Sequence, residues 1–443
     1  MKNRFVCCLL SGHLSAAALA ATDAPAASYS VAQIKPDKEL LITACEVVDH
    51  PDHANPAKPT GRFTLEYLLT GIARDGKPKT ALLEWLHAWK LTVNGQVYPL
   101  GQSVIDQWKC ADGQAGLSDE FWQPKFVHAP FRLLAIVNRM DLIRVTEDSG
   151  KERYAPEGRF VFGVLDKDGA PLSATVIFEY RLPAKTMEEM QLWAESWHEL
   201  ASLEFSDPKY CQLLANLTER FTSRASLASP SLLAQIRTNE QDLSLRFVTD
   251  DEWSLHEFRL DPAGAIVAAP TRQTPATHLA LTSRLGHYIN EYAKRIEKGL
   301  YEVPETYCDK PFLGDQAITN PIGARNWVPA GVLEENKPAE KKFVENTCNG
   351  CHGQETQTPF LHIRPRITGE PAKLSAFLRK KDNSWSEEMN FRAGKLVDFL
   401  NWKSSAPPTH TAKGSPQVLA LPLPVADGPI VPMELRARGG RVH

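Results

Sequence analysis

Five consecutive residues near the C-terminus have the types and spacing to do chemistry: Cys348-Asn349-Gly350-Cys351-His352. Two thiols three positions apart lie about one helical turn from each other, so both can form thioether bonds to the vinyl groups of one porphyrin. The imidazole that follows then lies under the iron, for which a neutral ring nitrogen is a good ligand. This CxxCH spacing is the attachment pattern of haem c, and we expect one haem c per chain with His352 as an iron ligand.

The motif is specific. With 8 Cys and 13 His among 443 residues, the number of chance matches to it is roughly 0.004. Two other interpretations stay open. A redox dithiol normally lies in a βαβ unit, which the surrounding sequence does not indicate. A zinc site needs two further ligands at close spacing, and His362 supplies only one.

Four side chains that follow the motif in the sequence are candidate haem contacts. His362 is the second iron ligand that we favour, and Met389 is the alternative; a thioether raises the haem potential, whereas a second imidazole lowers it. Arg364 and Arg366 carry planar donors that suit the haem propionates. Each candidate also has a structural interpretation: a core methionine, a structural histidine, or surface ion pairs.

Residues 336–404 place these side chains in one small helical unit. A helix over 335–347 leads into the motif, a loop follows, and an amphipathic helix over 391–402 ends the unit. In this order the segment resembles a monohaem cytochrome c domain, and the resemblance implies a small all-α fold. The whole chain also resembles a group of exported bacterial proteins, which implies an architecture but no activity. That resemblance rests on Asn346-Thr347-Cys348-Asn349-Gly350-Cys351-His352-Gly353, Phe360-Leu361-His362-Ile363 and Pro365-Arg366.

The larger part of the chain, residues 38–301, predicts an α+β domain with a mostly antiparallel sheet, because helical and strand-like patterns alternate without a repeat. It contains no dinucleotide, phosphate-loop, zinc-protease or serine-hydrolase motif, so whether the protein is an enzyme is left open. The expected strands are 38–48, 131–142, 159–165, 174–180, 243–248 and 254–260, and the expected helices are 63–72, 83–90, 186–205, 208–224 and 276–298.

The ends of the chain indicate export. Residues 1–20 combine a basic start, an apolar stretch and the small residues Ala18 and Ala20, which is typical of a signal peptide. We therefore expect a periplasmic, secreted or cell-surface protein. Residues 21–37 are interpreted as a flexible start, 302–335 as a linker, and 405–443 as a proline-rich tail, in which His410 is a weaker candidate ligand.

Export also bears on the remaining cysteines. Cys45, Cys110, Cys211 and Cys308 lie outside both the signal segment and the motif. Because an exported chain meets an oxidising environment, we expect at least one disulfide among these four, although their spacing does not rank the three possible pairings.

Composition limits the partners. The net charge is −3 and 43% of the residues are hydrophobic, so no global basic surface points to nucleic acid. After the signal segment no apolar run approaches the length of a membrane span. The function expected is electron transfer through the haem to a redox partner protein. The alternatives are an oxidoreductase whose N-terminal domain acts on a substrate, and a surface binding or structural module with a haem sensor.

Overall fold

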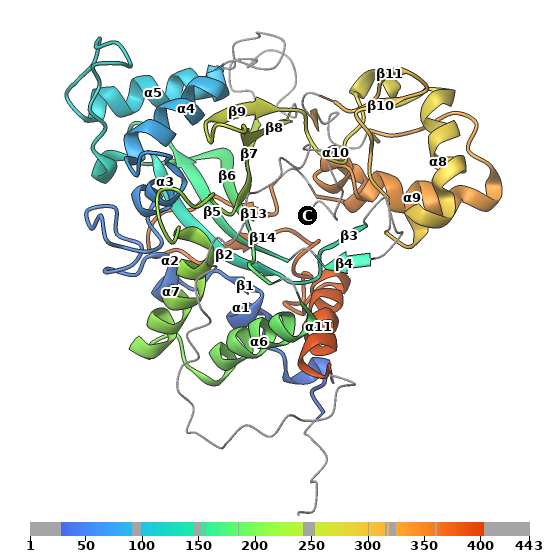
Figure 1. Ribbon diagram of the computed structural model, residues 1–443, viewed down its shortest axis with the longest axis horizontal. Helices are drawn as coiled ribbons and strands as arrows, with labels where there is room; N and C mark the ends of the chain where they lie inside the picture. The colour runs from blue at the N-terminus through green and yellow to red at the C-terminus, as the bar shows by residue number, and fades with distance from the viewer. Residues whose placement is uncertain are drawn as a thin grey trace, which may run out of the picture.

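The computed structural model describes residues 28–90, 99–145, 152–154, 156–184, 186–241, 253–299, 301–314, 317–318, 325–358 and 361–402. The predicted signal peptide, the strand expected over 243–248 and the proline-rich tail, including His410, lie outside the described residues. Helices gather on both sides of one large sheet (Figure 1). Among the described residues, no helix combines the length and apolarity needed to cross a membrane.

The large sheet is antiparallel throughout and has the strand order β1-β2-β5-β6-β7-β8-β12, with β9 paired to β8. This confirms the predicted α+β class with a mostly antiparallel sheet. The strands are β1 (Leu41–Ile42), β2 (Phe131–Arg139), β5 (Glu157–Leu165), β6 (Pro171–Arg181), β7 (Leu233–Gln241), β8 (Trp253–Leu260), β9 (Ile266–Ala269) and β12 (Ala317–Ile318). Three small two-stranded sheets are β3 (Ile143–Val145) with β4 (Glu152–Tyr154), β10 (Thr306–Tyr307) with β11 (Lys310–Pro311), and β13 (Ile363–Arg364) with β14 (Lys373–Leu374).

The prediction of one strand over 38–48 is wrong. This segment forms α1 (Pro36–Glu39), the two-residue strand β1 and α2 (Cys45–Val48). Pro36 stands in the first turn of α1, where its missing N–H costs nothing and its fixed φ favours a helix. Only Leu41 and Ile42 pair with β2, so the apolar run marks burial rather than a long strand.

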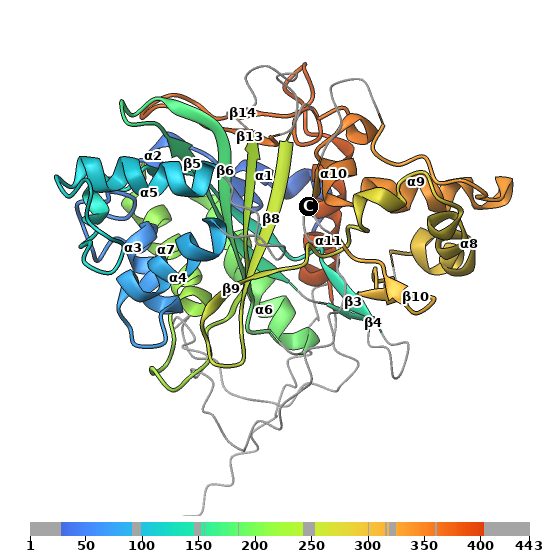
Figure 2. The same ribbon diagram turned by 90° about the horizontal axis from the view of Figure 1, so that it is seen from above.

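One face of the sheet is apolar and is covered by helices. In Figure 2, α3 (Leu65–Ile72), α4 (Pro78–Lys90), α5 (Pro99–Ala111) and α7 (Pro208–Thr222) lie on this side. Trp85 contacts Phe178 edge-on, with ring centroids 5.5 Å apart. Phe221 packs on Tyr180 at 5.7 Å. A Cβ at Gly158 would lie 2.3 Å from the Phe221 ring, so glycine lets α7 approach β5 this closely.

The opposite face carries buried charges, because side chains alternate between the two faces of a strand. Arg159 lies opposite Glu179, and Arg237 lies opposite Glu257. Arg237 donates to Glu179 at 3.3 Å and to Glu257 at 3.1 Å, and Arg159 contacts Glu179 at 3.3 Å. All four are at most 5% exposed. Buried charges require such pairing, and we call these four residues and Glu157, which pairs with Arg159, the charged face.

The C-terminal segment shares its cores with the rest of the chain. Helix α9 (Lys337–Glu345) packs on α8 (Ser283–Glu297), and α11 (Glu387–Leu400) packs on α6 (Met187–His198). Phe312 and Trp327, from the segment interpreted as a linker, belong to the α8–α9 cluster. The segment is thus anchored at both ends on the helices that precede it.

The predicted disulfide is absent from this structure, in which none of the six described cysteines is bonded to another cysteine. Cys45 donates to the carbonyl of Glu370 at 3.3 Å, and Cys211 lies buried on α7 near the carbonyl of Glu46. Cys110 and Cys308 are exposed. The sequence prediction was wrong for this structure because it rested on cysteine number and compartment, whereas each thiol lies in its own separate environment.

Candidate metal and cofactor site

The CxxCH motif begins in α10 (Cys348–Cys351), a single helical turn. Thr347 caps this turn, since its hydroxyl accepts the N–H of Gly350 at 3.0 Å and donates to the carbonyl of Val344 at 2.7 Å. A Cβ at Gly350 would lie 1.9 Å from that same carbonyl oxygen. Glycine is therefore required here by close backbone packing.

The other variable residue of the motif, Asn349, fixes the turn to the preceding segment. Its side-chain oxygen accepts the indole N–H of Trp327 at 2.8 Å, and its carbonyl accepts the amide of Asn326 at 3.0 Å. The Glu355 carboxylate accepts the backbone N–H groups of Asn326 and Trp327 at 2.7 and 3.1 Å. Sequence analysis missed both Asn326 and Trp327, because they lie in a region without periodic pattern.

Three side chains with metal-binding atoms meet at the end of α10. The donor atoms of Cys351, His352 and His362 all lie within 4.8 Å of one another. Cys351 Sγ is 3.3 Å from His362 Nε2, and the two imidazole centroids are 4.3 Å apart. The structure thus places His362 beside the motif, where a second iron ligand would have to lie. We call these three residues the Cys-His-His cluster.

The two imidazoles are oriented by their neighbours. Trp253, on β8, stacks on His352 with centroids 4.9 Å apart and an interplanar angle of 15°. The hydroxyl of Ser375 lies 2.9 Å from Nδ1 of His362, which turns Nε2 toward Cys351. Phe377 covers the other side of His362 at 4.9 Å. Nothing in the sequence pattern identified Trp253 or Ser375 as neighbours of the two histidines.

Cys348 is buried in a different place. Its sulfur points to the carbonyl of Arg272 at 3.8 Å, and its N–H donates to the hydroxyl of Thr274 at 3.0 Å. It packs in a small cluster with Trp253, Leu255 and Ala317. The two thiols of the motif therefore have different surroundings, and only Cys351 belongs to the Cys-His-His cluster.

Burial also sets the protonation of the thiols. It raises the pKa of Cys348 to about 11, although Arg237 on the charged face opposes the shift. It raises the pKa of Cys351 well above its ordinary value, and Glu388 adds to the effect. A catalytic dithiol needs a lowered thiol pKa, so these environments argue against the redox-dithiol interpretation.

Of the other candidate residues, Arg366 and Met389 have contacts elsewhere, and Arg364 is exposed. Both terminal nitrogens of Arg366 donate to the carboxylate of Asp49, at 2.9 and 3.1 Å. Arg364 is exposed on β13. Met389 is fully buried in the main core, and its N–H donates to Ser386. Among the described contacts, none of the three touches the Cys-His-His cluster.

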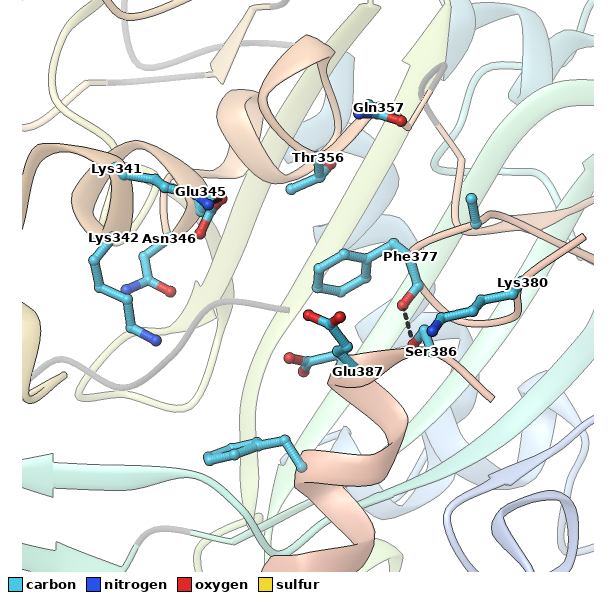
Figure 3. Close-up of a pocket in the computed structure, with 13 residues that line it drawn as sticks. Lys341, Lys342, Glu345, Asn346, Thr356, Gln357, Phe377, Lys380, Ser386 and Glu387 are labelled. Carbon is cyan, nitrogen blue, oxygen red and sulfur yellow. Dashed lines mark hydrogen bonds and ion pairs between the residues drawn. The ribbon is translucent and has the colours of Figure 1, made fainter. Parts of the chain in front are cut away.

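A pocket of about 490 Å³ adjoins the site. Figure 3 shows Lys341, Lys342 and Asn346 on one wall and Phe377 and Glu387 on the other. Phe377 is shared with His362, so the pocket reaches the edge of the Cys-His-His cluster. The full lining is Lys341, Lys342, Glu345, Asn346, Thr356, Gln357, Ala376, Phe377, Lys380, Ser386, Glu387, Glu388 and Phe391, and includes neither sulfur.

The residues fit haem attachment in part. Two thiols and an imidazole follow one another on a capped turn, as attachment requires. Metal–imidazole bonds are about 2 Å long, so two imidazoles on opposite sides of one iron have centroids roughly 6 Å apart. The observed 4.3 Å between His352 and His362 is too short for a porphyrin between them. His352 therefore fits as an iron ligand, and His362 fits as the second one only after the rings separate.

The chain was also compared with known proteins. No family model, no curated protein and no solved structure matches it.

Proposed function

We propose that this is an exported protein that carries one haem c, attached through Cys348 and Cys351 and ligated by His352, and that it transfers single electrons to a redox partner protein. The observation that carries the proposal is the CxxCH sequence on one capped and buried helical turn. Haem, when attached, supplies a one-electron iron couple.

The polypeptide would hold the attachment turn rigidly. The cap by Thr347 and the bond from Trp327 to Asn349 fix α10 at both its start and its middle. Stacking on Trp253 orients His352. Contacts of this kind fix the orientation of a metal ligand and influence the reduction potential of the iron. Buried charges around the site influence that potential as well.

His362 is the second ligand that we propose, and Met389 is the alternative. His362 already contacts both Cys351 and His352, and the hydrogen bond of Ser375 to Nδ1 directs Nε2 toward the motif. Met389 would have to leave the main core before it could serve. The oxidoreductase alternative has one observation in its favour: the adjoining pocket has a size typical of small-ligand sites.

Variants distinguish the roles. Protein made with haem-attachment machinery should show a reversible absorption change between its oxidised and reduced forms. Cys348→Ser with Cys351→Ser should abolish covalent haem, while Cys110→Ser, an exposed thiol outside the site, should leave it intact. His362→Ala should open the iron to cyanide, and Met389→Ala should not. If Cys110→Ser and the double variant retain equal haem, attachment at the motif is excluded.

A further inference from the structure

The Cys-His-His cluster has the composition of a transition-metal site even without a porphyrin. Its sulfur and two imidazole nitrogens come from the end of α10 and from the loop before β13, and all lie within 4.8 Å of one another. Bonds of about 2.0–2.3 Å from one ion to N and S donors place neighbouring donors roughly 3–4 Å apart. The 3.3 Å between Cys351 Sγ and His362 Nε2 falls in this range.

The outer contacts match those of metal ligands. Ligating histidines usually engage their second ring nitrogen in a hydrogen bond, which fixes the tautomer and the direction of the free lone pair. The Ser375 hydroxyl lies at that position for His362, 2.9 Å from Nδ1. The stacked Trp253 restrains His352, and Phe377 shields His362. The cluster is therefore preorganised rather than a chance meeting of mobile side chains.

The two cysteines are unequal in this arrangement. Cys348 Sγ faces the carbonyl of Arg272 and packs with Leu255 and Ala317, outside the Cys-His-His cluster. Haem attachment uses both sulfurs, whereas the cluster uses Cys351 alone. This asymmetry separates the two kinds of binding experimentally.

We propose that the chain without haem binds one zinc- or copper-type ion through Cys351, His352 and His362. On binding, the Cys351 S–H bond breaks, its proton passes to solvent and a sulfur–metal bond forms, with no change of oxidation state. Three protein donors leave a fourth position for water, as in zinc sites of this kind. The inference does not depend on haem attachment, but the ion must leave before Cys351 and His352 can hold haem.

The test uses the full chain produced without haem-attachment machinery and titrated with Co²⁺ alone. A thiolate bound to Co²⁺ absorbs strongly in the near ultraviolet. We expect this band to saturate at one equivalent, to disappear when Zn²⁺ is added, and to persist in Cys348→Ser. Cys351→Ser should abolish it, and His362→Ala should weaken binding at least as much as Ser375→Ala, for which loss of the outer contact predicts about 10–100-fold.

Circular dichroism of each variant checks that it is folded. If Cys351→Ser fails to fold, the Co²⁺ affinities of Ser375→Ala and Cys348→Ser still test the site, because both variants keep all three donor side chains. The site requires a weaker affinity in Ser375→Ala than in Cys348→Ser. The proposal is overturned if folded wild-type protein gives no thiolate band, or if Cys348→Ser loses the band while Ser375→Ala keeps full affinity. Neither result touches the haem proposal, which is measured on matured protein.

Discussion

The two faces of the large sheet are both buried, but they differ in chemistry. One face packs Phe160, Phe178 and Tyr180 under the tryptophans and Phe221 of the covering helices. The other face carries paired arginines and glutamates and lies under the CxxCH segment. The comparison teaches that the apolar face contributes most of the stability, whereas the charged face forms the surroundings of the site.

The charged face is a poor way to gain stability. A buried ion network recovers little more than its desolvation cost, and apolar residues of similar size often do as well. Its charges do act on the motif, because Arg237 lowers and Glu257 raises the pKa of Cys348. The charges that act on the pKa of Cys351 lie outside the charged face: Arg139 is on β2, and Glu388 and Arg392 are on α11. We interpret the network as a fixed electrostatic environment for whatever the motif binds.

The largest expected effect on stability comes from a substitution that disrupts the apolar face. Trp85 is fully buried and contacts Trp89, Phe131 and Phe178. Trp85→Ala should lower the free energy of unfolding by about 3–5 kcal/mol, because a large cavity replaces these contacts. Urea unfolding followed by circular dichroism measures the change. Phe121→Ala, at a residue 67% exposed, is the control and should stay within about 0.5 kcal/mol.

The next largest effect on stability comes from a substitution that disrupts the ion pairs of the charged face. Glu257→Gln leaves Arg237 and Arg259 without a shared carboxylate. The free energy of unfolding should fall by about 3 kcal/mol, since removing one partner of a buried pair leaves uncompensated charge. Asp398→Asn, in an exposed pair with Lys395, should change it by less than about 1 kcal/mol. Equal effects of the two substitutions would show that burial of the charged face is unimportant.

The same carboxylate predicts an acid dependence. Burial raises the pKa of Glu257, but Arg259, Arg237 and Arg272 outweigh burial and lower it to about 2, from 4.5. The stabilisation is therefore complete above pH 4.5 and is lost as the pH falls toward 2, because the unfolded state then binds the proton more readily. Urea midpoints measured across this range should decline, and less steeply in Glu257→Gln. Parallel declines in both proteins would contradict the assignment to Glu257.

A smaller effect concerns the turn of the motif. Gly350→Ala places a Cβ against the Val344 carbonyl and should cost about 1–3 kcal/mol through overpacking. Gly394→Ala, in α11 with nothing within 4 Å of the added Cβ, should instead stabilise by up to about 1 kcal/mol. Thermal unfolding of both variants gives the two signs. A stabilising Gly350→Ala would remove the packing argument for the motif.

Sequence predicted the apolar face better than the charged one. Runs of Val, Ile and Phe marked β2, β5 and β6, and the motif with His362 was found from spacing and residue type. The charged side chains on the same strands gave no signal, because the partners of Arg237 lie on neighbouring strands, 20 and 58 residues away in sequence. Trp253 was missed because only tertiary packing brings it to the motif. Trp327 was missed because it also lies in a region without a periodic pattern.

The most direct test of the central claim is the intact mass of the denatured, acid-extracted protein after production with haem-attachment machinery. The account predicts the mass of the mature chain plus one haem, with the added mass on the peptide that contains Cys348 and Cys351. A chain that loses all haem on extraction, or whose added mass lies on another peptide, would contradict it.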